Sequence, residues 1–241
     1  SSLGHKVLIF DNQKSKYLKI NQKFVKGDIK KIDDHESIFR NVDYVYNFAG
    51  ISDIEASKKK PAETILVNIL PVVKILQMCN KNNVKKFIFA STIYVYSKNG
   101  YYYKCSKISA ELYIREFCKI NKLKYGILRY GSLYGPRSNS LNGVYNLLEK
   151  IITKKKLNFI GRSDSKREYI HVTDAAKASV DLTNKKYDNQ SITITGGTSY
   201  RLKDIIQIVS EILGKKIKVN FSNKLNTDNG HYHYTPYNLI E

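Results

Sequence analysis

The chain has 241 residues, of which 42% are hydrophobic and 26% charged, as is ordinary for a globular protein with one large core. Its three cysteines form no CxxC pair, so neither a disulfide framework nor a zinc site is indicated, and no metal site is expected. The most apolar stretch, residues 64–76, is interrupted by Pro71 and Lys74 and is too short to cross a bilayer, and residues 1–6 do not resemble a signal peptide. These features predict a cytoplasmic protein with no membrane partner.

The formal net charge of +20 raises the question of a nucleic-acid partner. The lysines are spread along the whole chain, with short runs such as 58–60 and 154–156, and the few arginines do not cluster on a reading helix. We therefore expect a solvated lysine surface and no nucleic-acid site, although such a surface still attracts anions such as nucleotide diphosphates. A nucleic-acid binder stays an alternative, and its signature would be salt-sensitive binding.

In residues 1–130, short apolar runs alternate with longer helical patterns. Strands are predicted at 7–10, 44–48, 87–90 and 125–129, and helices at 61–80 and 104–121. Because each run is apolar on both faces, it fits a parallel strand that helices cover. Strand–helix alternation at this spacing predicts an α/β fold with a doubly wound parallel sheet.

The pattern changes downstream. Residues 143–154 have a helical pattern, 170–172 predict a short strand that leads into a helix, and 191–195 predict a further strand. Residues 202–213 predict an amphipathic helix that ends at Gly214, because glycine readily adopts the left-handed conformation of a helix stop. These elements predict a smaller lobe beside the main sheet.

Tyr103 is the candidate catalytic base. Of the three consecutive tyrosines at 101–103, it is the one with a lysine, Lys107, four residues later, which places both side chains on one face of a helix. Tyrosine titrates at about 10 in water, so a fixed ammonium beside it is needed to favour the phenolate at neutral pH. In a chain rich in Tyr and Lys, the alternative is a chance pair on a surface helix.

Thr92 follows the strand at 87–90, at the carboxyl end where ligands bind in open α/β sheets. We expect its hydroxyl to hold the substrate oxygen that Tyr103 deprotonates, which makes Thr92 a catalytic and a substrate-binding candidate. The alternative is that Ser91 and Thr92 only end the strand or cap the following turn.

Together, Ser91-Thr92 with Val95-Tyr96, and Tyr103 with Lys107, resemble the Ser/Thr–Tyr–Lys triad of extended short-chain dehydrogenases/reductases. The resemblance implies a Rossmann-type sheet and NAD as the cofactor. It also implies that Lys107 holds the cofactor ribose and, with the nicotinamide ring, lowers the pKa of the tyrosine.

Other segments resemble this family's cofactor contacts in the same order along the chain. An acid at the end of the second strand holds the adenosine ribose and disfavours a 2′-phosphate, a GDI element flanks the adenine, and a small-residue turn approaches the cofactor. A helical asparagine supports the catalytic site. The resemblance thus assigns NAD to Asp11, Asn12, Asp28, Ile29, Phe48, Ala49, Gly50 and Asn68, together with Tyr103 and Lys107.

Two later segments resemble nucleotide-sugar enzymes in particular. Residues 128–137 are similar to the motif LRYxNxYGP, and residues 167–174 are similar to RDYIHVxD. The resemblance implies that Arg167 binds the substrate diphosphate, a bidentate task that suits a guanidinium. Ser132 stands where the family has a substrate-binding asparagine.

The chain departs from the family pattern at its start, because no GxxGxxG turn occurs anywhere in the sequence. We expect a truncated chain that lacks the first strand of the sheet. Ile93 and Tyr94 stand where sugar 4,6-dehydratases have an Asp-Glu pair, which argues against dehydration.

The sequence therefore predicts an NAD-dependent, 4-epimerase-like enzyme that acts on a nucleotide-diphosphate sugar through a keto sugar. A 4-keto reductase of the same family and a non-catalytic binding relic are the alternatives, and a homodimer is a further partner to consider. The expected domains are a Rossmann-type domain, 1–136 with 167–185 returning to it, and a substrate lobe, 137–166 with 186–241.

Overall fold

The computed structural model describes residues 4–97, 100–153, 156–160, 163–164 and 166–222. The chain divides into two compact units. The first unit consists of Ser1–Ser91, Tyr101–Ile127 and Leu182–Ser191. The second unit consists of Thr92–Gly100, Leu128–Asp181 and Ile192–Glu241.

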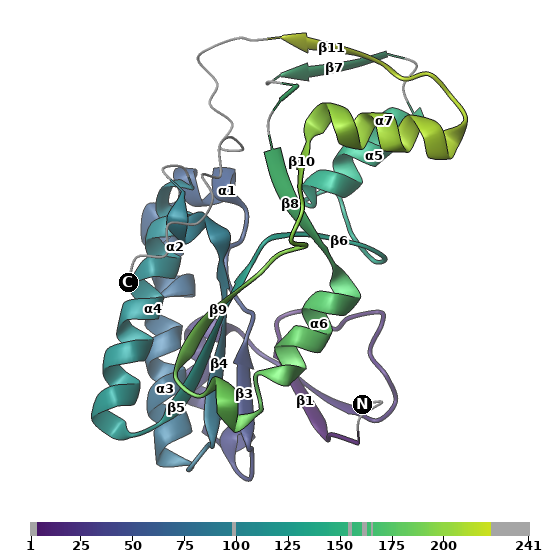
Figure 1. The fold of residues 1–241 in the computed structure, drawn as a ribbon. Coiled ribbons are helices and arrows are strands. Elements are labelled where there is room, and N and C mark those ends of the chain that lie inside the picture. The colour runs from purple at the N-terminus through teal and green to yellow at the C-terminus, as the bar shows by residue number, and fades with distance from the viewer. Residues whose placement is uncertain (1–3, 98–99, 154–155, 161–162, 165, 223–241) are drawn as a thin grey trace. The chain divides into compact units, whose positions relative to one another are not determined.

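The strands of the first unit fall into two hydrogen-bonded groups (Figure 1). One is the parallel pair β1 (Val7–Asp11) and β2 (Gln22–Lys26). The other has the strand order β3-β4-β5-β9, and β3 and β4 run parallel. Its strands are β3 (Tyr44–Asn47), β4 (Lys86–Thr92), β5 (Lys124–Tyr130) and β9 (Gln190–Ile194). All the strands expected before residue 130 are present, and the α/β class is confirmed, whereas β2 was not predicted.

Helices lie between these strands and carry most of the first unit's packing. They are η1 (Ile29–Phe39), α1 (Ile54–Lys59), α2 (Pro61–Asn68), α3 (Leu70–Lys81), α4 (Tyr101–Asn121) and the short η3 (Lys185–Tyr187). In Figure 1, α3 and α4 lie side by side, in mutual contact. Their buried residues, among them Leu76 and Ile114, form one core with Phe87 and Phe89 of β4.

The single helix expected at 61–80 is wrong, because the chain forms two helices that meet at Ile69. Pro71 explains the break, since its ring lacks an N–H and disfavours helical geometry just before it. The combined stretch Pro61–Lys81 is long and apolar enough, by length and composition, to cross a membrane. In this fold Val72, Ile75 and Leu76 of α3 instead fill the core of the first unit, as the central helix of a water-soluble protein would.

The second unit contains two small sheets. The first has the order β10-β8-β6, with β6 (Ser132–Tyr134) parallel and β10 (Ser199–Arg201) antiparallel to β8 (Lys166–His171). The second is the parallel pair β7 (Lys156–Ile160) and β11 (Lys218–Ser222).

The helices among the described residues of this unit are η2 (Ile93–Tyr96), α5 (Gly143–Thr153), α6 (Val172–Asp181) and α7 (Leu202–Leu213). Leu147 and Ile151 of α5 pack with Leu202 and Ile206 of α7 in a separate core. The predicted end of α7 is confirmed, because Gly214 has a left-handed φ of 59°.

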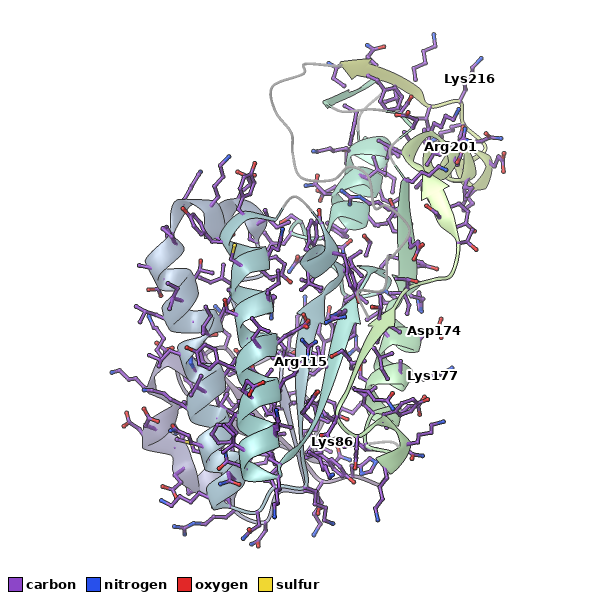
Figure 2. The ribbon with its side chains drawn as sticks, turned by 60° about the vertical axis from the view of Figure 1, so that its left-hand side comes forward. Lys86, Arg115, Asp174, Lys177, Arg201 and Lys216 are labelled. Carbon is purple, nitrogen blue, oxygen red and sulfur yellow. The ribbon has the colours of Figure 1, made fainter. Side chains whose placement is uncertain are left out.

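Lys86 is a buried cation at the start of β4 (Figure 2). Its Nζ donates to the carbonyls of Leu182 (2.8 Å) and Asn184 (3.0 Å) and forms an ion pair with Asp188. The paired Oδ1 of Asp188 is buried and has no hydrogen-bond partner among the described residues. Lys86 therefore joins β4 to the segment that leads into β9.

We predict that Lys86→Met lowers the free energy of unfolding by about 3 kcal/mol, because it leaves two carbonyls and a partly buried carboxylate without their cation. Urea denaturation measures the loss. Lys85→Met is the matched control: Lys85 is 69% exposed and pairs with Asp43 at the surface, so its loss should change stability little. Equal effects of the two substitutions would contradict the structural role of Lys86.

Candidate active site

Helix α4 buries a polar face. Tyr103, Ser106, Lys107 and Glu111 are each less than 10% exposed, at the spacing of one helical stripe. The pair is therefore not on an exposed helix surface, and its catalytic role stays a prediction. A buried face of this composition is costly unless every polar group has a partner, so it marks a candidate functional site.

The ammonium of Lys107 lies between β4 and the candidate base. Its Nζ donates to the carbonyl of Ala90 at 2.7 Å and lies 4.6 Å from the ring centre of Phe89 and 5.9 Å from that of Tyr103. Burial lowers the pKa of Lys107 to about 8, and the nearby Glu111 carboxylate opposes that shift. Lys107 is thus mostly protonated at neutral pH, and its charge is little screened by water.

Glu111 connects the same helix face to β4 directly and to β9 through Arg115. Its carboxylate accepts hydrogen bonds from Ser91 (2.6 Å) and from Arg115 (2.9 Å), which lies one turn further along α4. Arg115 also donates to Ser191 at the start of β9 (3.0 Å; Figure 2). The sequence analysis did not single out Glu111, because nothing in the spacing of acids along a helix distinguishes a buried carboxylate from an exposed one.

Asn68 connects α4 to the loop that follows β3. Its Oδ1 accepts from the amide of Ile51 (2.7 Å), and its Nδ2 donates to Ser106 (2.9 Å) and to the carbonyl of Ile51 (3.0 Å). In the same loop a Cβ on Gly50 would come within 3.0 Å of Asn68 Oδ1 and 3.9 Å of Lys107 Nζ. A side chain at position 50 would press on Asn68, so glycine lets the loop backbone lie close to Asn68 and Lys107.

The rest of the predicted turn is exposed. Phe48 is 59% exposed and stacks on Tyr46 with ring centres 6.0 Å apart, while the amide of Ala49 donates to Asn47 (3.1 Å). An exposed aromatic ring and backbone beside a buried ammonium leave this turn open to a ligand.

The residues expected to hold adenosine lie at the end of β1 and at the start of η1. Asp11 and Asn12 are exposed where β1 ends, and a carboxylate oxygen of Asp11 accepts from the amide of Gln13 (2.9 Å). Asp28 caps η1 by accepting from the amide of Lys30 (2.9 Å), and Ile29 is half-buried against the core. The parallel pairing sets Asp11 opposite Lys26, so the acid and the GDI element share one end of the strand pair.

These positions fit the two nucleoside ends of NAD. An exposed carboxylate at the end of β1 can accept from ribose hydroxyls, and the turn at Phe48, Ala49 and Gly50 offers backbone beside the Lys107 ammonium. The sequence contains no GxxGxxG turn to cradle the diphosphate. The residues present therefore fit both ends of the cofactor and include no phosphate turn of that type.

Thr92 is the first residue of the second unit, and its placement beside Tyr103 stays a prediction. Its Oγ1 accepts from the amide of Tyr94 (3.2 Å) and so caps η2. The expected alternative, a cap for the following turn, is thus present. Because the cap uses a lone pair, the hydroxyl hydrogen of Thr92 can still donate to a ligand.

Ser132 and Arg167 lie in the three-stranded sheet of the second unit. Ser132 of β6 is paired with Tyr169 of β8, two residues from Arg167 on the same strand. Side chains two residues apart on a strand point to the same face, so Arg167 and Tyr169 share one face of β8. Burial raises the pKa of Tyr169, and the Arg167 guanidinium opposes that shift.

Lys107→Met should change how stability depends on pH. The folded-state pKa of about 8 lies below the unfolded value of about 10.5, so the wild type gains stability as pH rises from 8 to 10.5. The gain is about 3 kcal/mol, and the methionine variant lacks it. Urea unfolding of both proteins between pH 7 and pH 10.5 measures the difference. A difference that stays constant over this range would show that the buried ammonium is not strained.

Comparison with known proteins adds independent information. The model of the NAD dependent epimerase/dehydratase family matches residues 1–195. A crystal structure of UDP-glucose 4-epimerase from Thermotoga maritima with UDP-glucose aligns with a TM-score of 0.83 and 27% identity, over 92% of this chain and 80% of that one. UDP-N-acetylglucosamine 4-epimerase from Methanobrevibacter ruminantium, in complex with UDP-N-acetylmuramic acid, has a TM-score of 0.83 and 26% identity, over 94% and 80%.

An oxidoreductase is similar to the same degree. The dTDP-4-dehydro-6-deoxyglucose reductase of Escherichia coli is 28% identical over 236 residues, which cover 91% of this chain and 72% of the relative. The family match spans the β1–β2 pair, the buried face of α4 and the strand β8 that carries Arg167. The chain belongs to the NAD-dependent epimerase/dehydratase family.

Proposed function

We propose that the protein is an NAD-dependent epimerase that inverts a ring carbon, C4 by analogy with its relatives, of a nucleotide-diphosphate sugar. The observation that carries the proposal is the buried pair of Tyr103 and Lys107 on one face of α4, next to the close approach of Gly50. A buried tyrosine and a little-screened ammonium are the groups that proton transfer at a sugar hydroxyl requires.

In the proposed reaction Tyr103 takes the proton of a ring hydroxyl while the carbon that bears it loses a hydride and becomes a ketone. Lys107 stabilises negative charge on the phenolate oxygen, because its ammonium is held near the ring by the Ala90 carbonyl. After the keto sugar has turned over, Tyr103 returns the proton as hydride is added to the opposite face. When bound, NAD supplies the hydride acceptor of the first half and the hydride donor of the second.

The cofactor would lie along the first unit. Asp11 and Asn12 would bind the adenosine ribose, Asp28 and Ile29 would flank the adenine, and Lys107 would hold the nicotinamide ribose. Phe48, Ala49 and Gly50 would border the cofactor with exposed backbone and ring, and Asn68 would fix that turn through Ile51. A carboxylate at Asp11 favours NAD over NADP, because it repels a 2′-phosphate.

The substrate would be bound by residues of the second unit. Arg167 would fork onto the diphosphate, Ser132 would donate or accept one hydrogen bond near it, and Thr92 would donate its free hydroxyl hydrogen to the reacting oxygen. The net charge of +20 would draw a dianionic substrate to the surface. Free thiols at Cys79, Cys105 and Cys118 fit a reducing, cytoplasmic location, and a homodimer stays a further proposal.

A nucleotide-sugar 4-keto reductase is the second candidate, because the E. coli reductase is 28% identical over 91% of this chain. The same Tyr103 and Lys107 would then protonate a ketone once. Dehydration is disfavoured, because Ile93 and Tyr94 offer no carboxylate after Thr92 and Ile93 is buried.

Two measurements test the proposal. Purified protein is denatured, and the supernatant is assayed for NAD by mass spectrometry. The native protein is then incubated with UDP-sugars and dTDP-sugars, and the products are separated by chromatography. Released NAD with interconversion of a 4-epimer pair is the expected result. Net reduction of a 4-keto sugar by added NADH would favour the reductase, and no turnover of either class would contradict both.

Tyr103→Phe should lower kcat about 10²–10⁴-fold, because phenylalanine keeps the ring and loses the acid–base group. Tyr102→Phe is the matched control: Tyr102 is the preceding residue, is 47% exposed and should leave kcat unchanged. Initial rates of product formation measure both variants. A loss of less than about tenfold in Tyr103→Phe would rule out the acid–base assignment.

A further inference from the structure

Two buried serines hold the backbone of Tyr103. The amide of Tyr103 donates to Ser57 Oγ at 3.1 Å, and the hydroxyl of Ser106 donates to the carbonyl of Tyr103 at 2.8 Å. Tyr103 is the third residue of α4, so its amide has no acceptor within the helix and needs one from elsewhere. Ser57, from α1, supplies it across 46 residues of sequence.

The serines belong to a circuit of hydrogen bonds that is closed by the backbone between Ile51 and Ile54. From Tyr103 it passes through Ser106 to Asn68 (2.9 Å), and from Asn68 to both backbone groups of Ile51. In the other direction the hydroxyl of Ser57 donates to the carbonyl of Ile54 (2.7 Å). Both branches therefore end in the same short segment, which directly follows Phe48, Ala49 and Gly50.

The circuit is shielded from water. Ser57 is 0% exposed, and Asn68 and Ser106 are each 2% exposed. Hydrogen bonds in such surroundings are stronger than at a surface, and a group that loses its partner there cannot turn to solvent instead. The position of the Tyr103 backbone is thus coupled to the position of the turn that borders the proposed cofactor.

We propose that Ser57 and Ser106 are positioning residues, which set the hydroxyl of Tyr103 in register with the turn at Gly50. This inference rests on the proposed function, in which Tyr103 is the acid–base group. Two rotatable bonds join the Tyr103 phenol to the hydrogen-bonded backbone. A small movement of that backbone therefore displaces the phenol oxygen. Misplacement by about 1 Å can cost about 10²-fold in rate.

The test compares Ser57→Ala and Ser106→Ala in the full chain, alone and in the Tyr103→Phe background. We expect each alanine variant to lower kcat about tenfold or more, with KM within about threefold of wild type. In the Tyr103→Phe background the serine changes should lower kcat no further, because they act through the tyrosine. A merely structural role would lower the melting temperature and leave kcat of the folded protein unchanged.

Ser179→Ala is the matched control. Ser179 is also a buried, hydrogen-bonded serine: it bonds to the carbonyl of Ala175 (2.5 Å) and with the hydroxyl of Tyr130 (2.6 Å), but it lies in the second unit. It should lose stability to a similar degree with unchanged kcat. If Ser57→Ala and Ser106→Ala behave like Ser179→Ala, the positioning role is overturned.

Hydrogen exchange at the Tyr103 amide separates this inference from the proposed function. The amide should be protected in the wild type, should exchange about tenfold faster or more in Ser57→Ala, and should not change in Ser179→Ala. If the wild type turns over no substrate, the proposed function fails, and this exchange result alone decides whether Ser57 clamps Tyr103. Equal protection in wild type and Ser57→Ala overturns the clamp.

Discussion

The buried polar face of α4 is the constraint on which the rest of the first unit depends. A helix that packs on a sheet normally turns an apolar stripe inward, but here Tyr103, Ser106, Lys107 and Glu111 lie in that stripe. Each must find a partner within the protein, because none can reach bulk water. Lys107 and Glu111 bond to the end of β4, and Ser106 bonds to Asn68, which holds the loop after β3. Arg115, the other partner of Glu111, reaches the start of β9, so these bonds fix all three segments against α4.

The same polar face lowers the stability of the folded protein, because it buries the Lys107 ammonium that the proposed reaction uses. An ammonium with a pKa of about 8 is held charged at neutral pH in a place that favours the neutral amine, since burial outweighs the help of Glu111. Further along α4, Ala110, Ile114 and Cys118 return to apolar packing against α3 and β4. The unfavourable burial of a charge therefore lies in the N-terminal part of α4, which carries the proposed site. The apolar packing of the later turns holds the helix in the core.

The strands and α4 could be predicted because their patterns are local. Apolar runs such as 87–90 and the four-residue spacing of Tyr103 and Lys107 are properties of neighbouring residues. β2 could not be predicted in this way, since Gln22–Lys26 has only two apolar residues, Phe24 and Val25, and among the described residues it pairs only with β1. The hydrogen bond of Ser57 could not be predicted either, because its donor is the amide of Tyr103, 46 residues away. No sequence pattern distinguishes this serine from others in short helices.

Within the described part of the chain, the proposed adenosine site is held in the first unit by side-chain packing and not by hydrogen bonds between β1 and the larger sheet. Among the described residues, β1 is hydrogen-bonded to β2 and not to β3, and both β1 and β3 are half-exposed while β4 is buried. η1 attaches the pair to α2 and α3. Its ion pairs from Asp33 and Glu36 to α3 are partly exposed and add little.

The buried side chains of η1 carry that attachment. Ile32 is 1% exposed and Phe39 4%, and both belong to the core formed with α3 and β4. Burying two such side chains is worth about 1.5–3 kcal/mol each, which exceeds what the surface ion pairs contribute. Asp28 caps the start of η1, so the proposed adenine contact is positioned by the same apolar packing that joins η1 to α3, which in turn packs on α4.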